Sequence, residues 1–576
     1  MKKLLAAITT ITFCLTMTHA QVEQPLEDVN HVMDLTYDSL AKAQTARIPS
    51  GSSRKGDHPV LFLVGNSTMR NGTLGNGSNG QWGWGFYAHT FFDENKITVE
   101  NQALGGMSSR TFYTKLWPDV KKGIRPGDWV IISIGHNDNG PYDSGRARAS
   151  IPGVGMDSLR VTIQETGVKE TVYTYGEYLR KYIRETRAIG AHPILMSLTP
   201  RDDYDAQTGK IVRKQHTQWC AYVAATEGVP FVDLNEISGA KLDSYSKWKE
   251  KYHFYLDHIH SSRFGAMMNA RSAAEGIYFS ENPALAPLKA MMVHMVPDTY
   301  PVCREKGNPV VWITGDSTVK NEDKDPKGMW GWGSQAYTVF DSKKITCFNA
   351  AKAGRSARTF LNEGRWDRVY NSIQPGDFVL LEFGHNDIGG IDKDKERGEI
   401  ASAADTCHVY RSAKTGTYEL VYSFGWYLKK FIDDVREKGG IPILVSLTPR
   451  NEWQDGKIER RNETYGKWYR QVVKETGCEF VDLHNLTADF LDKSCGNKEK
   501  ALKYFNHDHT HTSLLGARIN ARNVAKGLKE INSPPAKYLK RERNDRQGNR
   551  RENQGDCQHR RCGRRVRDIT EKWCQL

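Results

Sequence analysis

The sequence predicts an α/β protein of two tandem domains, each a three-layer unit with a parallel β-sheet between helices. Three observations predict this class. The chain has 576 residues, whereas a single hydrophobic core stops growing at about 250–300 residues. Five sequence blocks occur twice in the same order, and short apolar runs alternate with segments of helical periodicity.

The repeated blocks define the domain organisation. Each second copy follows the first by about 250 residues, which is a comfortable length for one domain. The pairs are 60–68 with 310–318, 101–112 with 349–360, 135–138 with 384–387, 193–201 with 442–450, and 257–260 with 508–511. Because five blocks keep one order and a nearly constant spacing, the two halves are homologous.

The strands are predicted from short apolar runs that suit burial on both faces of a sheet. In the first copy these runs are 61–64, 129–134, 194–197 and 231–234. Helix-like segments lie between them, such as 175–189, where Tyr178, Leu179, Tyr182 and Ile183 fall on one face. This alternation favours a parallel sheet, whose reactive loops lie at the carboxyl ends of its strands.

The termini and the seam complete the predicted organisation. Lys2 and Lys3 precede an apolar run, and Thr18-His19-Ala20 offers a small-residue cleavage pattern typical of a signal peptide. We therefore expect a secreted or periplasmic protein. Prolines between 283 and 309 interrupt any long helix at the seam. The predicted segments are a signal peptide 1–20, a lead-in 21–57, domain 1 over 58–285, a linker 286–307, domain 2 over 308–532, and a basic, disordered tail 533–576.

The charge distribution bears on the expected partners. The formal net charge is +13, but Lys and Arg concentrate in the tail and leave the rest nearly balanced. We therefore expect no nucleic-acid partner. The tail is either a solvated appendage or a tether to a polyanion such as pectin. No apolar run reaches the length of about 20 residues that a membrane span needs. The oligomeric state is left open.

The ten cysteines are scattered and form no paired metal motif. Cys14 lies in the predicted signal peptide. The second half offers a pool for one or two disulfides: Cys303, Cys347, Cys407, Cys478 and Cys495.

A serine, a histidine and an aspartate recur in both copies at equivalent places. Ser317 follows an apolar strand, on a sharp turn that would expose its hydroxyl. A serine hydroxyl is a poor nucleophile until an imidazole accepts its proton, and a carboxylate fixes the tautomer of that imidazole. Asp508 and His511, three residues apart, can meet on one face of a turn. The first copy holds the same set: Ser67, Asp257 and His260.

These blocks resemble the SGNH/GDSL hydrolases, which are flavodoxin-like, and specifically the rhamnogalacturonan acetylesterase group of carbohydrate esterases. The resemblance spans about residues 58–285 and 308–532. It implies that Ser67 and Ser317 are nucleophiles served by the two Asp–His pairs. It implies an oxyanion hole, completed by the serine backbone N–H, at Gly106 and Asn137 in the first copy and at Gly354 and Asn386 in the second. Such acyl transfer needs no cofactor.

One residue of the first copy departs from the family pattern. Asn66 stands beside Ser67, where the second copy has Asp316 beside Ser317. Asparagine keeps the shape and one acceptor oxygen but loses the charge. Because Asp257 can still orient His260, we expect domain 1 to be active but altered. The alternative is a degenerate binding module.

Several neighbouring residues have two interpretations. Trp84 and Trp332 present aromatic faces to sugar rings or pack in the core. Arg201 and Arg450 pair with a galacturonate carboxylate or hold their loops by hydrogen bonds. The remaining candidates are the histidines.

His136 and His385 are expected to be scaffolding or substrate contacts. Extra imidazoles raise the question of a metal site, but no matching carboxylate spacing accompanies them, so we expect no metal. They are His258, His507 and His509.

The functional hypothesis is a secreted serine esterase that removes O-acetyl groups from an acetylated, acidic plant cell-wall polysaccharide, with rhamnogalacturonan or a related pectin favoured. The same fold hosts other acyl substrates, so acetylxylan, sialate and lipid esterases are alternatives. A third hypothesis is a carbohydrate-binding protein with one or both sites silent.

Overall fold

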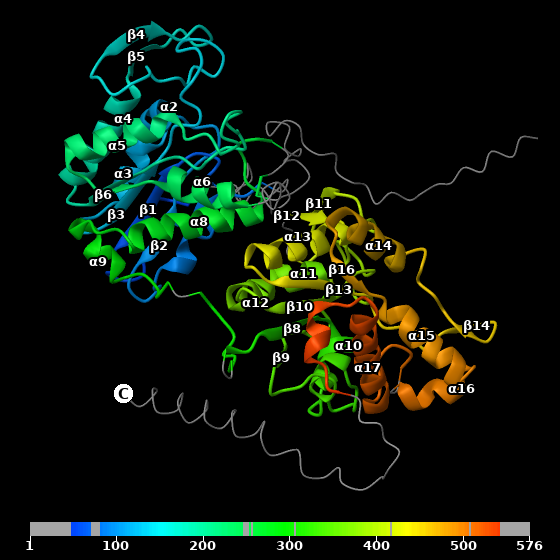
Figure 1. Ribbon diagram of the computed structural model, residues 1–576. Helices are drawn as coiled ribbons and strands as arrows, with labels where there is room; N and C mark the ends of the chain where they lie inside the picture. Colours follow the sequence, from blue (N-terminus) through cyan, green and yellow to red (C-terminus); the bar gives the residue numbers. More distant parts are fainter. Residues whose placement is uncertain are drawn as a thin grey trace, which may run out of the picture.

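The computed structural model describes residues 48–70, 81–245, 253–254, 257–295, 297–304, 307–414, 418–505 and 508–541, which form two α/β domains (Figure 1). The predicted signal peptide, most of the lead-in and most of the tail lie outside these residues.

Domain 1 is built on a parallel five-stranded sheet in the order β2-β1-β3-β6-β7. Its strands are β1 (Val60–Gly65), β2 (Thr98–Asn101), β3 (Trp129–Ser133), β6 (His192–Met196) and β7 (Phe231–Val232). Its helices are α2 (Ser109–Lys115), α3 (Trp117–Gly123), α4 (Tyr175–Ala188), α5 (Gln215–Glu227), α6 (Leu234–Ser244), α8 (Arg263–Tyr278) and α9 (Ala286–Lys289), with short 3₁₀ helices at Trp84–Phe86, Ala88–Phe91 and Pro283–Leu285. The hairpin of β4 (Ser158–Thr162) and β5 (Lys169–Tyr173) projects from one end, at the top of Figure 1.

Domain 2 repeats this topology with the sheet order β9-β8-β10-β13-β16. Its strands are β8 (Val310–Gly315), β9 (Thr346–Asn349), β10 (Phe378–Glu382), β13 (Ile441–Val445) and β16 (Glu479–Val481), with hairpins β11 (Cys407–Arg411)/β12 (Tyr418–Tyr422) and β14 (Trp453–Gln454)/β15 (Lys457–Ile458). Its helices are α10 (Ser317–Lys320), α11 (Ala357–Asn362), α12 (Arg365–Ser372), α13 (Phe424–Glu437), α14 (Tyr465–Thr476), α15 (Leu483–Ser494), α16 (Lys498–Ala501) and α17 (Leu514–Glu530), with 3₁₀ helices at Trp332–Thr338, Leu502–Tyr504 and Pro534–Tyr538.

The core of each domain has two halves, one on each face of its sheet. Along β1 all six residues are buried, because helices cover both faces. Phe62 packs with side chains of α2 to α5, whereas Leu63 packs with α8 and α9 on the other face. β8 divides its side chains in the same way. The predicted fold class, two tandem parallel sheets between helices, is confirmed.

The domains extend further than the sequence boundaries indicated. Arg54, placed in the lead-in, pairs at 2.6 Å with the buried Asp128 of domain 1, and Arg304, placed in the linker, pairs at 2.5 Å with the buried Asp377 of domain 2. At the other ends, Leu288 is buried in domain 1 and Leu539 in domain 2. Arg54 and Arg304 keep the same spacing as the repeated blocks, but both lie outside the blocks from which the boundaries were drawn.

The expectation of disulfides in the second half is wrong. Four of the five cysteines in the proposed pool carry free thiols, so no pair within the pool can form: Cys347, Cys407, Cys478 and Cys495. Cys347 and Cys478 are instead packed among hydrophobic core side chains, and burial raises the pKa of each thiol to about 12.

The two domains touch beside the domain 1 triad. The Arg263 guanidinium, at the start of α8, donates to the Asn362 backbone carbonyl at 2.8 Å. Next to it, Phe264 stacks on Trp426 of α13 with ring centroids 6.5 Å apart. The helix that follows His260 therefore packs against domain 2.

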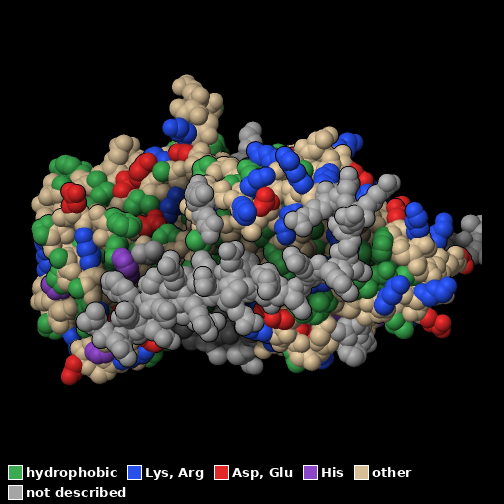
Figure 2. Space-filling view, turned by 60° about the horizontal axis from the view of Figure 1, so that its bottom comes forward, with side chains coloured by type: hydrophobic (Ala, Val, Ile, Leu, Met, Phe, Trp, Pro, Cys, Tyr) green, Lys and Arg blue, Asp and Glu red, His purple; other side chains and the backbone are tan. Residues whose placement is uncertain are grey.

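The surface drawn in Figure 2 mixes both signs of charge, with Asp and Glu side chains between the Lys and Arg side chains. Within the described ranges, none of the helices combines the length and the apolar character that crossing a bilayer requires.

Candidate active site

In domain 1 the three predicted residues of the triad form one hydrogen-bonded chain. Ser67 lies just beyond the carboxyl end of β1, and its Oγ is 2.8 Å from Nε2 of His260. Nδ1 of His260 is 2.7 Å from Oδ2 of Asp257. The other oxygen of Asp257 accepts the backbone N–H groups of Ile259 and His260 at 2.7 Å each. The carboxylate is therefore fixed by its own turn, and it holds the imidazole toward the serine.

Domain 2 repeats this geometry. Ser317 begins α10, separated from the end of β8 by one residue, and its Oγ lies 2.8 Å from Nε2 of His511. Nδ1 of His511 lies 2.7 Å from Oδ2 of Asp508, whose Oδ1 accepts the N–H of Thr510 at 2.7 Å. The two copies thus share the same Ser–His–Asp distances.

Both aspartates are electrostatically suited to remain ionised. Burial alone would raise the pKa of Asp257, but the hydrogen bonds and charge of His260 lower it below the usual value. In Asp508, burial is likewise outweighed by the backbone and side-chain hydrogen bonds of His511, and the pKa is lowered. An ionised carboxylate fixes the histidine tautomer that can accept a serine proton.

The loops after the next two strands bring the predicted oxyanion residues to the same edge of each sheet. Gly106 and Gly354 have left-handed φ angles of +77° and +78°, which favour glycine. The Nδ2 of Asn137 donates to the Met107 carbonyl at 3.0 Å, and that of Asn386 donates to the Arg355 carbonyl at 3.1 Å. Each asparagine is thus tied to the glycine loop and keeps one Nδ2 hydrogen for another acceptor.

Comparison with known protein families agrees with this geometry. Residues 61–270 match the family described as GDSL-like lipase/acylhydrolase, and residues 313–519 match a second description of it, so the matches together span well over half of the chain. The chain belongs to the GDSL-like lipase/acylhydrolase family. It carries two GDSL domains and is an ester-hydrolysing enzyme.

Individual relatives resemble single GDSL domains. The rhamnogalacturonan acetylesterase of Emericella nidulans is 29% identical over 212 residues, covering 37% of this chain and 81% of the relative. The probable rhamnogalacturonan acetylesterase YesY of Bacillus subtilis is 29% identical over 238 residues, covering 40% of this chain and 98% of the relative. Among solved structures, a mutant of an acetylxylan esterase from Geobacillus stearothermophilus has a TM-score of 0.28 and 22% identity, covering 41% of this chain and 98% of that chain.

The residue before each serine differs between the GDSL domains but keeps its geometry. Asn66 and Asp316 are fully buried, and each accepts the N–H of a threonine two residues later, at 3.2 and 2.8 Å. Burial raises the pKa of Asp316. The substitution therefore replaces an ionisable side chain by a neutral one and keeps the hydrogen bond to the threonine.

A second difference lies behind this one and was not predicted. Glu382 ends β10 opposite Gly315, and Ser133 ends β3 opposite Gly65. The buried acidic pair of GDSL domain 2, Asp316 with Glu382, is thus replaced by neutral residues in GDSL domain 1. Ser133 and Glu382 are separated by the same number of residues as the repeated blocks, so the repeat spacing is the sequence signal for this difference.

The two tryptophans predicted as substrate contacts are buried, which corrects that assignment. Trp84 is 2% exposed and Trp332 is 1% exposed, each in the core under its sheet. Of the two interpretations given above, the structure therefore supports packing. The indole of Trp332 also donates to the carboxyl group of Glu382.

The histidine of each Gly-His-Asn-Asp block joins two loops. His136 Nε2 lies 3.0 Å from the Thr199 hydroxyl, and His385 Nε2 lies 3.1 Å from the Thr448 hydroxyl. Burial, together with the charge of a nearby arginine, holds the pKa of both histidines well below its usual value. Each is therefore a neutral imidazole bonded within the scaffold.

The two predicted arginines lie on these loops. Arg201 donates to Nδ1 of His136 at 3.3 Å and to its backbone carbonyl at 3.1 Å, so its guanidinium holds the loop. The Nε of Arg450 is buried with no hydrogen-bond partner among the described residues.

The extra imidazoles pair with acids rather than gathering around a common point. His258 Nδ1 lies 2.8 Å from Asp203, and His509 Nε2 lies 3.4 Å from Glu452. His507 lies outside the described residues. Across the part of the chain that the structure describes, no three His, Cys, Asp or Glu side chains are grouped as metal ligands would be.

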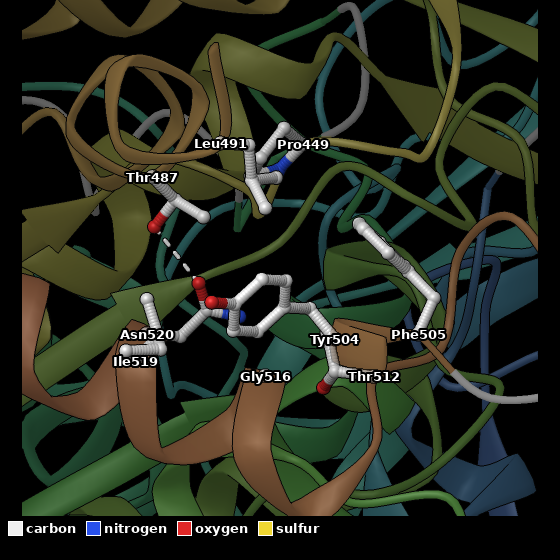
Figure 3. Close-up of a pocket in the computed structure, with 9 residues that line it drawn as sticks. All are labelled: Pro449, Thr487, Leu491, Tyr504, Phe505, Thr512, Gly516, Ile519 and Asn520. Atoms are coloured by element: carbon white, nitrogen blue, oxygen red, sulfur yellow. Dashed lines mark hydrogen bonds between the residues drawn. The ribbon is translucent and has the colours of Figure 1, made fainter. Parts of the chain in front are cut away.

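A small pocket of GDSL domain 2 lies between α15 and α17 (Figure 3). Thr487 and Asn520 are hydrogen-bonded at 2.8 Å across it. No acid, base or thiol lines it, so it offers no chemistry of its own. Its lining residues are Pro449, Thr487, Leu491, Tyr504, Phe505, Thr512, Gly516, Ile519 and Asn520.

Proposed function

We propose that this enzyme removes O-acetyl groups from a plant cell-wall polysaccharide, with rhamnogalacturonan as the favoured substrate. The observation that carries this proposal is the unbroken Ser–His–Asp chain in both domains, at the same distances. The substrate class is supported by the names of the relatives, each of which is similar to one domain at 29% identity.

In domain 1, Ser67 is the proposed nucleophile. Its Oγ attacks the acetyl carbonyl carbon while Nε2 of His260 accepts the hydroxyl proton. The resulting imidazolium is stabilised by the ionised Asp257. When the tetrahedral intermediate collapses, the bond to the sugar oxygen breaks, and His260 returns its proton to that oxygen. Acetyl-serine and a free sugar hydroxyl remain.

Water completes the reaction. His260 accepts a proton from a water molecule, which attacks the acetyl-serine carbonyl. Collapse of the second intermediate releases acetate and restores the Ser67 hydroxyl. Ser317, His511 and Asp508 carry the same steps in domain 2.

The oxyanion of both intermediates is proposed to bind three donors at the sheet edge. These are the serine backbone N–H, the N–H of Gly106 or Gly354, and the Nδ2 hydrogen that Asn137 or Asn386 keeps. Losing one such donor costs about 10²–10³ in kcat.

Domain 1 has a second candidate role, because it lacks both buried acids of domain 2. If the neutral Asn66 and Ser133 lower activity strongly, domain 1 serves as a carbohydrate-binding copy beside an active domain 2. The complete hydrogen-bonded chain at Ser67 favours an active domain 1.

The location of the enzyme follows from the proposed substrate. We propose that residues 1–20 direct export and that the enzyme meets the polymer outside the cytoplasm. The basic C-terminal residues are proposed to be solvated and to take no part in the chemistry.

The test is acetate release by the wild type, Ser67→Ala, Ser317→Ala and the double variant. The substrates are acetylated rhamnogalacturonan, acetylated xylan and a short-chain aryl acetate. Each single variant should keep part of the activity on rhamnogalacturonan, and the double variant should lose it. Ser244→Ala and Ser494→Ala, exposed serines of the same two domains, should behave as the wild type.

Each other outcome has a defined meaning. Loss of all activity in Ser317→Ala alone would make domain 1 the binding copy. Release from xylan and not from rhamnogalacturonan would contradict the proposed substrate. Unchanged acetate release by the double variant would contradict the assigned nucleophiles.

A further inference from the structure

Two arginines outside the predicted site occupy the same place in both domains. Arg148 follows β3 and donates from Nη1 to the carbonyl oxygen of Gly106 at 3.1 Å. Arg397 follows β10 and donates from Nη1 to the carbonyl oxygen of Gly354 at 3.2 Å. Each guanidinium therefore lies against the glycine that is proposed to help form the oxyanion hole.

Neither arginine forms an ion pair with a described residue. Within the described residues, no carboxylate oxygen lies within 4.0 Å of a nitrogen of Arg148 or Arg397, and one of the five N–H groups of each has a partner. Arg110 and Arg358, in the helices that follow the same glycine loops, differ: each pairs with a glutamate through two nitrogens. Arg110 and Arg358 are thus paired with acids, whereas the two arginines beside the proposed oxyanion hole are available to a substrate carboxylate.

The surroundings of the two cations favour an incoming anion. Both side chains are half-buried, so part of their hydration is already removed. Burial and the charge of Arg146 lower the pKa of Arg148, and the charge of Arg397 acts on Asp316, beside the nucleophile of domain 2. The carboxyl groups that interact electrostatically with Arg148 and Arg397 are those of Asp138 and Asp316, respectively. Both are buried.

We propose that Arg148 and Arg397 are specificity-determining residues that bind the carboxylate of an acidic sugar next to the acetylated one. Guanidinium and carboxylate match in geometry and form charge-assisted hydrogen bonds. The bond to the glycine carbonyl holds each guanidinium in place before the substrate arrives, which lowers the entropy cost of binding. The inference rests on the proposed acetylesterase activity and adds the reason for a preference for acidic polymers.

The experiment isolates one domain at a time in the full chain. Arg148→Gln is made together with Ser317→Ala, and Arg397→Gln together with Ser67→Ala, so that one serine remains in each protein. KM and kcat are measured on acetylated rhamnogalacturonan, acetylated xylan and an aryl acetate. Arg146→Gln and Lys395→Gln remove an exposed positive charge from the same loops and serve as matched controls.

The glutamine variants should raise KM for the acidic polymer by about tenfold or more, which is the scale of a lost charge-assisted hydrogen bond. KM for acetylated xylan and for the aryl acetate should not change. Arg148→Lys and Arg397→Lys keep the charge and should retain part of the preference. The preference of the parent proteins should weaken as salt is added.

Three results would overturn the inference. Equal losses on all three substrates would mean that the arginines only hold the glycine loops. An unchanged KM for the acidic polymer would mean that they do not touch the substrate. If the parents release no acetate from any substrate, the proposed function fails instead, and calorimetry with an unacetylated galacturonate oligomer still decides the inference. Equal binding by parents and glutamine variants would overturn it.

Discussion

The hydroxyl of Thr318 lies 2.8 Å from Oδ1 of Asp316 and 3.1 Å from Oε1 of Glu382. A hydroxyl has one hydrogen, so it donates to only one of these carboxyl groups. A protonated Glu382 can supply the second bond by donating its own hydrogen to the threonine oxygen. Burial and the neighbouring charge of Asp316 raise the pKa of Glu382 to about 8, which agrees with a proton at this site.

This proton should make domain 2 less stable as the pH rises. The unfolded chain loses the Glu382 proton near pH 4.5, whereas the folded chain keeps it up to about pH 8. Between these values the folded state binds more protons, so the free energy of unfolding falls with increasing pH. Thermal melting from pH 5 to pH 9 measures this slope, and Glu382→Gln, which cannot ionise, should reduce it.

The exposed Glu499→Gln is the control for this prediction and should leave the slope as it is. An equal slope in the wild type and in Glu382→Gln would mean that Glu382 is ionised throughout. Domain 1, with Ser133 at the equivalent position, should lack this contribution.

The orientation of the catalytic imidazole by its aspartate gives a second prediction. In a protein with Ser317→Ala, Asp257→Asn should lower kcat on an aryl acetate by about 10⁴, because the amide no longer fixes the required tautomer of His260. Asp203→Asn is a matched control, since Asp203 also bonds a histidine, His258, that does not reach the serine. A loss of less than tenfold in Asp257→Asn would remove Asp257 from the triad.

The sequence predicted those features that repeat or that follow a period. The doubled blocks located both triads, since Ser67 and Ser317 each follow a continuous apolar strand. Features that depend on a single residue could not be predicted from these patterns. Glu382 reads in the sequence as an ordinary strand end, and its importance comes from the strand register that places it behind Asp316. Trp84 was ambiguous because an aromatic residue next to glycine suits both a sugar platform and a core.

The left-handed glycines give a third prediction. Gly106→Ala forces an alanine to adopt φ +77°, at a cost of about 1–2 kcal/mol, although the nearest atom to the added Cβ would be 3.9 Å away. The chain can relieve this strain by rotating the peptide that carries the proposed oxyanion donor. We therefore expect kcat to fall more than the lost stability explains, when both are measured in a protein with Ser317→Ala.

Gly127→Ala tests the same strain away from the site. Gly127 has φ +87° and open space around its Cβ position, so its variant should lose similar stability and keep full activity. If both variants keep full activity, the Gly106 N–H is not an oxyanion donor.

The paired arginines at the domain starts give the last prediction. Arg304 donates to both oxygens of Asp377, which is fully buried and also accepts the backbone N–H of Val310 at the start of β8. Burial alone would raise the pKa of Asp377, but the bonds from Arg304 lower it, so the carboxylate stays ionised in the core. Arg304→Met would leave that charge without its partner, and removing one member of a buried pair costs about 3–5 kcal/mol.

Chemical denaturation of the full chain measures this loss, which should fall on domain 2 and leave the transition of domain 1 unchanged. Arg365→Met, which breaks the more exposed pair with Glu363, should cost less than about 1 kcal/mol. Similar small effects of both substitutions would mean that Asp377 is held by its backbone and Trp312 bonds alone. A large effect of Arg304→Met places the start of domain 2 before Arg304, within the segment that the sequence assigned to a linker.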